Sequence, residues 1–154
     1  MLDISHPAPD FTLPCDDGSS VCLSDLKGSP VVLFFYPRDD TSGCTREALS
    51  FTALADEFAA LGVKVFGISK DTLAKHEKFR DKHGLGVPLL SDAEEETCEA
   101  YGVWAEKSMY GKTFFGIVRS TFLIDADGNL AQIWRKVKVP GHAEEVLAAA
   151  KELG

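Results

Sequence analysis

A chain of 154 residues, 45% of them hydrophobic, has enough apolar surface to bury a sizeable core, so we expect residues 1–154 to form a single domain. The formal net charge of −8 disfavours binding to nucleic acid and to anionic membrane surfaces. The first residues, MLDISHP, include neither a basic region followed by an apolar stretch nor an apolar run long enough to span a membrane. We therefore expect a cytoplasmic protein that binds neither nucleic acid nor membranes.

The amino-terminal third of the chain predicts a hairpin and a buried strand. Residues 11–13 and 21–23 flank the polar segment 16–20, whose Asp-Gly pair suits a tight turn. Residues 31–36 are apolar without alternation, which is typical of a strand buried on both faces. We expect this strand at the centre of the sheet.

The middle of the chain alternates helices and strands. Apolar residues at spacings of three and four predict one helix over residues 42–61, ending at Gly62. Residues 63–69 predict a strand, and residues 71–83 predict a polar helix that ends at Gly84. Strand, helix and strand in this order predict a right-handed parallel crossover.

The last part of the chain completes the predicted sheet. Residues 88–91 predict a short strand and residues 94–101 a further helix. Residues 120–125 and 130–134 predict a hairpin around an Asp-Gly turn, and residues 142–153 predict the last helix. The order βββαβαβαββα predicts an α/β fold of thioredoxin-like type, with a mixed central β-sheet flanked by helices and an N-terminal β-hairpin.

The chemistry is expected in the segment 37–47, PRDDTSGCTRE, which follows the most buried strand and opens the longest predicted helix. This position exposes side chains at the carboxyl edge of the sheet, where α/β proteins usually place their sites. A thiol at a helix N-terminus near a guanidinium has a lowered pKa and is largely thiolate at neutral pH. Position alone makes Cys44 the candidate reactive thiol.

A family resemblance rests on the same segment. Pro37, Thr41 and Cys44 reproduce the Pro-x-x-x-Thr-x-x-Cys signature of peroxiredoxins, and Tyr36-Pro37 with Gly43-Cys44-Thr45 resembles the bacterioferritin comigratory protein, or PrxQ, branch. The resemblance continues in residues 8–11, 88–92, 101–104 and 119–125. It implies a thiol-dependent peroxidase that reduces hydrogen peroxide and organic hydroperoxides to water and alcohols and is recycled by an external thiol such as thioredoxin.

The resemblance and the chemistry together suggest a role for each site residue. An arginine just before the strand at 120–125 returns to the reactive cysteine in this family, and Arg119 matches it. Fixed donors must hold the peroxide as charge develops on the departing oxygen, and we expect them to be the Thr41 hydroxyl, the Cys44 N–H and the Arg119 guanidinium. Pro37 is expected to shield the thiolate, and Glu47 to orient an arginine. The product is a sulfenic acid on Cys44.

The recycling step depends on the remaining cysteines. Many PrxQ proteins place a resolving cysteine five residues after the reactive one, or in the next helix; here the first position is Leu49, and residues 71–83 contain no cysteine. We therefore favour a one-cysteine mechanism, the alternative being a two-cysteine mechanism with Cys98 as resolving cysteine. Cys98 and Tyr101 lie three apart on one helix face, so core packing is the expected role of Cys98.

The pairing of Cys15 with Cys22 depends on the hairpin register. A two-residue loop at residues 18–19 would place them opposite each other, whereas a loop at residues 17–18 would oppose Cys15 to Ser20. A reducing cytosol favours free thiols. No histidines and cysteines form a ligand set, so we expect no metal and no cofactor. We expect a monomer whose partners are a peroxide and a thiol reductant.

Two other functions use the same features. A thioredoxin-like disulfide reductase needs a second thiol about three residues from the first, but Thr41 and Glu47 occupy those positions. A non-enzymatic peroxide sensor or redox-regulated holdase would use Cys44 oxidation to change its surface. Peroxide turnover with added dithiol separates the alternatives, because a sensor reacts once and stops.

Overall fold

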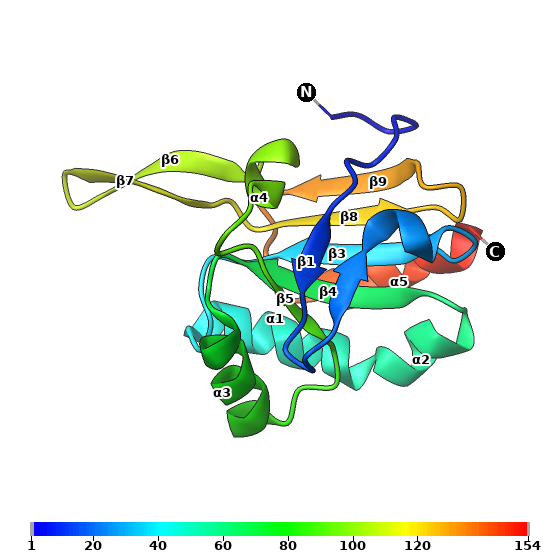
Figure 1. Cartoon of the computed structure of the whole chain (residues 1–154), viewed down its shortest axis with the longest axis horizontal. Coiled ribbons are helices and arrows are strands. Elements are labelled where there is room, and N and C mark those ends of the chain that lie inside the picture. Colours follow the sequence, from blue (N-terminus) through cyan, green and yellow to red (C-terminus); the bar gives the residue numbers. More distant parts are fainter. Residues whose placement is uncertain (1, 154) are drawn as a thin grey trace.

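The structure is a computed structural model that describes residues 2–153. Met1 and Gly154 lie outside the described residues. Met1 begins the segment in which the sequence predicts no leader. A five-stranded mixed sheet forms the centre of the molecule (Figure 1). In spatial order its strands are β5 (Leu89–Ser91), β4 (Lys64–Ser69), β3 (Val31–Phe35), β8 (Ser120–Ile124) and β9 (Leu130–Arg135).

The central strand is β3, as its uninterrupted apolar sequence predicts. All five of its residues are buried. It pairs in parallel with β4 and antiparallel with β8, so the predicted parallel crossover is confirmed. β8 and β9 form the predicted antiparallel hairpin. Because β3 and β8 are neighbours, the end of β3 and the start of β8 meet at one edge of the sheet.

Two apolar layers cover opposite faces of the sheet. One contains Phe34 and Cys44 and is formed with α1 (Ser42–Ala53), α2 (Ala55–Ala60), α3 (Leu73–His83) and α5 (His142–Leu153). The other contains Phe35 and Cys98 and is formed with β1 (Thr12–Pro14), β2 (Ser20–Cys22), the 3-10 helix Leu23–Leu26 and α4 (Thr97–Ala100). Successive side chains of β3 alternate between these layers. Cys44 and Cys98 therefore lie in cores on opposite faces.

The helix predicted over residues 42–61 is divided in two. Leu54, at φ −100° and ψ 5°, separates α1 from α2. Its N–H donates to the Phe51 carbonyl, three residues back, so the turn is tighter than in an α-helix. Phe58, on α2, is buried in the core, whereas Leu61 is exposed. The apolar spacing alone does not reveal this break.

The helix predicted over residues 94–101 is also shorter than expected. α4 contains only residues 97–100, because the Asp92 carboxylate accepts hydrogen bonds from the N–H groups of Thr97 (3.1 Å) and Cys98 (2.8 Å) and so starts the helix there. α3 agrees better with its prediction. The Thr72 hydroxyl caps its first turn, and Gly84 ends it in the left-handed conformation, with φ 63°.

One hairpin was not predicted. β6 (Trp104–Met109) and β7 (Lys112–Ile117) form an arm that extends away from the rest of the molecule (Figure 1). Its two-residue turn places both Tyr110 and Gly111 at positive φ, as in a type I′ turn. Most residues of the arm are exposed, so burial does not impose an apolar alternation. Tyr-Gly was the one local signal that could have revealed the turn.

The amino-terminal hairpin has a register different from both alternatives considered above. Pro14 pairs with Ser20 and the Cys15 N–H donates to the Ser19 carbonyl at 2.8 Å, which leaves a three-residue loop. Cys22 faces Thr12 instead of Cys15. Cys15 and Cys22 are free thiols in this structure. Among residues 2–153, no helix combines the length and apolar character needed to cross a membrane.

Candidate active site

Cys44 lies in the first turn of α1, directly beyond the end of β3. Thr41 occupies the N-cap position in an extended conformation, so the Cys44 N–H is among the first amides of the helix, which have no partner within it. These amides and the helix dipole favour a negative charge on the sulfur. The Cys44 side chain is nearly completely buried.

Arg119 reaches this sulfur from the start of β8. Its Nη2 donates to Cys44 Sγ at 3.3 Å, and its Nη1 donates to Glu47 Oε1 at 2.7 Å. Burial disfavours the arginine charge, but Glu47 and the Cys44 sulfur outweigh this effect and raise the pKa of Arg119. The structure thus brings together Cys44, Arg119 and Glu47, whose catalytic roles remain predictions.

Gly43 was not anticipated as part of this arrangement. A Cβ atom at position 43 would lie 3.2 Å from Arg119 Nη2. The absence of a side chain leaves space for the guanidinium beside the first turn of α1. A glycine directly before the reactive cysteine was visible in the sequence, but the close approach became evident only from the fold.

Glu47 is buried, and its second oxygen, Oε2, has no hydrogen-bond partner among residues 2–153. Burial raises the pKa of Glu47 to about 7, while the charge and hydrogen bond of Arg119 act in the opposite direction. A protonated Glu47 can still accept from Arg119, but it no longer offers a full negative charge. The strength of the pair that orients Arg119 therefore depends on pH near neutrality.

Replacing Glu47 with glutamine should change how stability depends on pH. The folded state retains a proton on Glu47 that the unfolded chain releases near its ordinary pKa of 4.5, so this contribution to stability is lost as pH rises through about 7. Glutamine does not titrate. Denaturant unfolding should show the variant gaining about 2–3 kcal/mol relative to the parent between about pH 5 and pH 8. Exposed Glu57→Gln is the control, and a pH-independent difference for Glu47→Gln would contradict the shift.

Thr41 and Pro37 lie in the segment between β3 and Cys44, and neither contributes a hydrogen bond to the sulfur. The Thr41 hydroxyl donates to the Arg38 carbonyl at 3.1 Å, so it must turn away from this acceptor to donate to a peroxide. Pro37 lines a depression of about 310 Å³ together with residues of the arm, including Lys107 and Phe115. Burial and the nearby charge of Arg119 lower the pKa of Lys107, although the Cys44 sulfur acts against this.

Cys98 is not brought near Cys44, because the sheet separates the layers in which they lie. The Cys98 side chain is completely buried beside Tyr101, so the predicted packing role is confirmed. Burial, reinforced by the neighbouring Asp92 carboxylate, raises the pKa of the Cys98 thiol. It is therefore a poor source of thiolate in this conformation.

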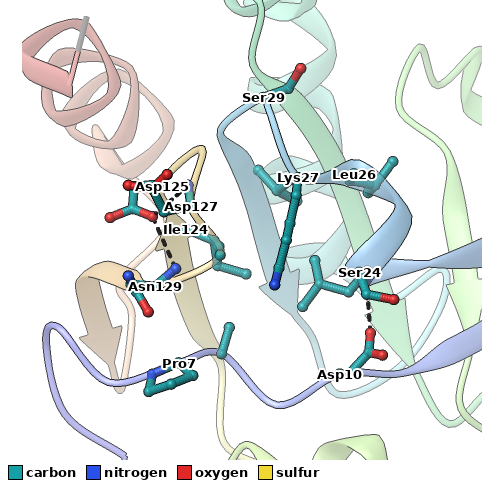
Figure 2. A pocket seen from close by; sticks show the side chains of 14 residues that line it. Pro7, Asp10, Ser24, Leu26, Lys27, Ser29, Ile124, Asp125, Asp127 and Asn129 are labelled. Atoms are coloured by element: carbon teal, nitrogen blue, oxygen red, sulfur yellow. Dashed lines mark hydrogen bonds between the residues drawn. The ribbon is translucent and has the colours of Figure 1, made fainter.

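A second depression lies far from these groups. It has a volume of about 290 Å³ and is formed by the amino-terminal segment, the start of β3 and the β8–β9 turn, with Lys27 reaching between them (Figure 2). Val31, at the beginning of β3, belongs to it, whereas Cys44 follows the end of the same strand. Cys44 does not line this depression.

Comparison with known proteins places this geometry in context. Residues 4–133 match the profile of the AhpC/TSA family. The chain is 47% identical over 146 residues to the putative peroxiredoxin bcp of Coxiella burnetii, covering 95% of this chain and 97% of that protein. It is 44% identical over 145 residues to peroxiredoxin Bcp of Escherichia coli, covering 94% and 93% of the two chains.

Solved structures show the same fold. A structure of the Xanthomonas campestris bacterioferritin comigratory protein, described in connection with alkyl peroxide reduction, superposes with a TM-score of 0.90 at 44% identity and covers 97% of this chain and 98% of that one. A Xylella fastidiosa PrxQ mutant gives a TM-score of 0.93 at 38% identity, covering 99% and 97%. The expected thioredoxin-like α/β fold is thereby confirmed.

Proposed function

Because this chain belongs to the AhpC/TSA family, and within it to the Bcp/PrxQ peroxiredoxins, we propose that it reduces peroxides through the sulfur of Cys44. It is a thiol-dependent peroxidase, so its substrates are a peroxide and a thiol reductant. The observation that supports Cys44 most directly is the 3.3 Å hydrogen bond from Arg119 to its sulfur at the N-terminus of α1. Both features place positive charge beside this sulfur, and the thiolate is the nucleophilic form of cysteine.

The reaction begins when the Cys44 thiolate attacks one peroxide oxygen. The S–O bond forms as the O–O bond breaks, and the departing oxygen leaves as water or an alcohol after taking a proton. Arg119 bridges the sulfur and Glu47, so its guanidinium is held where charge passes from sulfur to the departing oxygen. The product is a Cys44 sulfenic acid.

An external thiol then restores the enzyme. Its sulfur attacks the sulfenic acid, water leaves, and a mixed disulfide forms; a second thiol releases Cys44 and carries away the disulfide. We propose a one-cysteine cycle of this kind with thioredoxin or another thiol, because Cys98 lies on the opposite face of the sheet. The aromatic depression beside Pro37 supports organic hydroperoxides as substrates together with hydrogen peroxide.

Two experiments test the identity of the reactive sulfur and the recycling step. After one equivalent of peroxide without reductant, peptide mass spectrometry should find the added oxygen on Cys44 and no bond between Cys44 and Cys98.

Cys98→Ser should keep most thiol-supported turnover, since no disulfide forms across the sheet. Oxidation at another cysteine would refute the assignment of Cys44. Loss of thioredoxin-supported cycling in Cys98→Ser, with a fast first oxidation, would establish the two-cysteine alternative.

A further inference from the structure

A buried polar cluster lies under the loop that connects β3 to α1. Asp39, in this loop, and His76, on α3, have side chains that are 5% and 0% exposed. His76 Nδ1 lies 2.6 Å from Asp39 Oδ2, and the Tyr36 hydroxyl donates to Asp39 Oδ1 at 2.6 Å. Neither Asp39 nor His76 belongs to the peroxide chemistry described above.

The hydrogen-bond partners of His76 limit where its ring hydrogens can lie. His76 Nε2 lies 2.9 Å from the Leu90 carbonyl, which can only accept, so Nε2 carries a hydrogen. His76 Nδ1 faces Asp39 Oδ2, an oxygen that accepts when the side chain is a carboxylate. The geometry on both sides of the ring therefore suits a histidine that donates from both nitrogens to Leu90 and Asp39. In agreement, burial lowers the pKa of His76, but Asp39, with smaller contributions from Leu90 and Asp71, raises it overall.

The same loop is also held through its backbone. The Asp39 N–H donates to Asp71 Oδ2 at 2.8 Å, and the Ser69 hydroxyl donates to the same oxygen at 2.7 Å. Through Asp71 and Ser69 the loop is joined to the end of β4. Through His76 it is joined to α3 and to β5. Thr41, the N-cap of α1, follows Asp39 by only two residues, and its hydroxyl donates to the carbonyl of Arg38 within this loop.

We propose that Asp39 and His76 are positioning residues of the peroxidase, whose buried hydrogen-bonded pair fixes the loop so that Thr41, Pro37 and the first turn of α1 are correctly placed around Cys44. This inference rests on the proposed role of Cys44 and extends it to groups that do not touch the substrate. Displacements of about 1 Å reduce catalysis strongly, so a fixed loop has a kinetic effect as well as a structural one.

The adjacent carboxylate provides a matched control. Asp40 pairs with Lys82 and His83 at 2.8 Å each, but its side chain is 44% exposed. Exposed ion pairs contribute little. Asp40 also has a positive φ of 60°, which asparagine tolerates, so Asp40→Asn removes the charge without straining the backbone.

The test compares peroxide reduction with alkylation of Cys44 by iodoacetamide, which needs the thiolate but not the peroxide donors. Asp39→Ala should lower the peroxide rate about tenfold, while the alkylation rate stays equal or rises as the Pro37 shield loosens. Asp39→Asn should keep both rates within about threefold. Its amide can donate to a neutral His76 and accept from Tyr36, so every hydrogen bond in the cluster is retained. Asp40→Asn should match the parent.

If Asp39→Ala does not fold, Tyr36→Phe replaces it. This change deletes only the hydroxyl that donates a hydrogen bond to Asp39. The ratio of the peroxide rate to the alkylation rate should then fall about threefold. An unchanged ratio in the folded variant, or an equal fall in both rates, would overturn the positioning role. Retained turnover in Cys44→Ser would instead overturn the proposed function, so the two failures are distinguishable.

Discussion

Cys44→Ser should abolish peroxide turnover while leaving the fold intact. A serine hydroxyl is not ionised near neutral pH and cannot replace the thiolate as nucleophile. The side chain is nearly completely buried, but its size hardly changes and Arg119 can donate to the hydroxyl as it does to the sulfur. Peroxide consumption with added dithiol measures the loss, and circular dichroism monitors the fold.

The matched control is Cys22→Ser, since Cys22 is a partly exposed thiol on β2. It should retain the parental rate, which would show that loss of a cysteine in itself does not inactivate the protein. Turnover in Cys44→Ser above the rate of free dithiol would contradict the assignment and direct attention to another cysteine.

Arg119→Met should lower the rate of peroxide reduction by about 10² or more, which corresponds to about 2.7 kcal/mol of lost transition-state stabilisation. Methionine keeps much of the side-chain bulk but removes both the donor to the Cys44 sulfur and the partner of Glu47. The departing oxygen then lacks the cation that would stabilise its developing charge. Stopped-flow measurement of Cys44 oxidation isolates this step from recycling.

Two further variants show which property of Arg119 matters. Arg119→Lys keeps the charge but cannot bridge Cys44 and Glu47 with a planar fork, so an intermediate rate is expected. Arg46→Ala should have little effect, because Arg46 is exposed on α1. A rate within about threefold of the parent in Arg119→Met would show that another cation, Arg46 or Lys107, performs this role.

Local sequence patterns were sufficient for much of the fold. The unbroken apolar sequence of β3 predicted a central strand, because only a strand covered on both faces has no polar alternation. Glycines marked the ends of α2 and α3 through their positive φ. The position of Cys44 also followed from the sequence, since a strand that leads directly into a helix places the first helical turn at the sheet edge.

Contacts between distant segments were decided only by the tertiary structure. The β6–β7 arm has little buried surface to impose a pattern, and the early start predicted for α4 failed because Asp92 binds the amides at residues 97 and 98. The hydrogen bond between His76 and Asp39 joins residues 37 positions apart, so the sequence showed only a polar helix around His76. Hydrogen bonds and burial between remote residues are properties of the packed chain, and no local spacing encodes them.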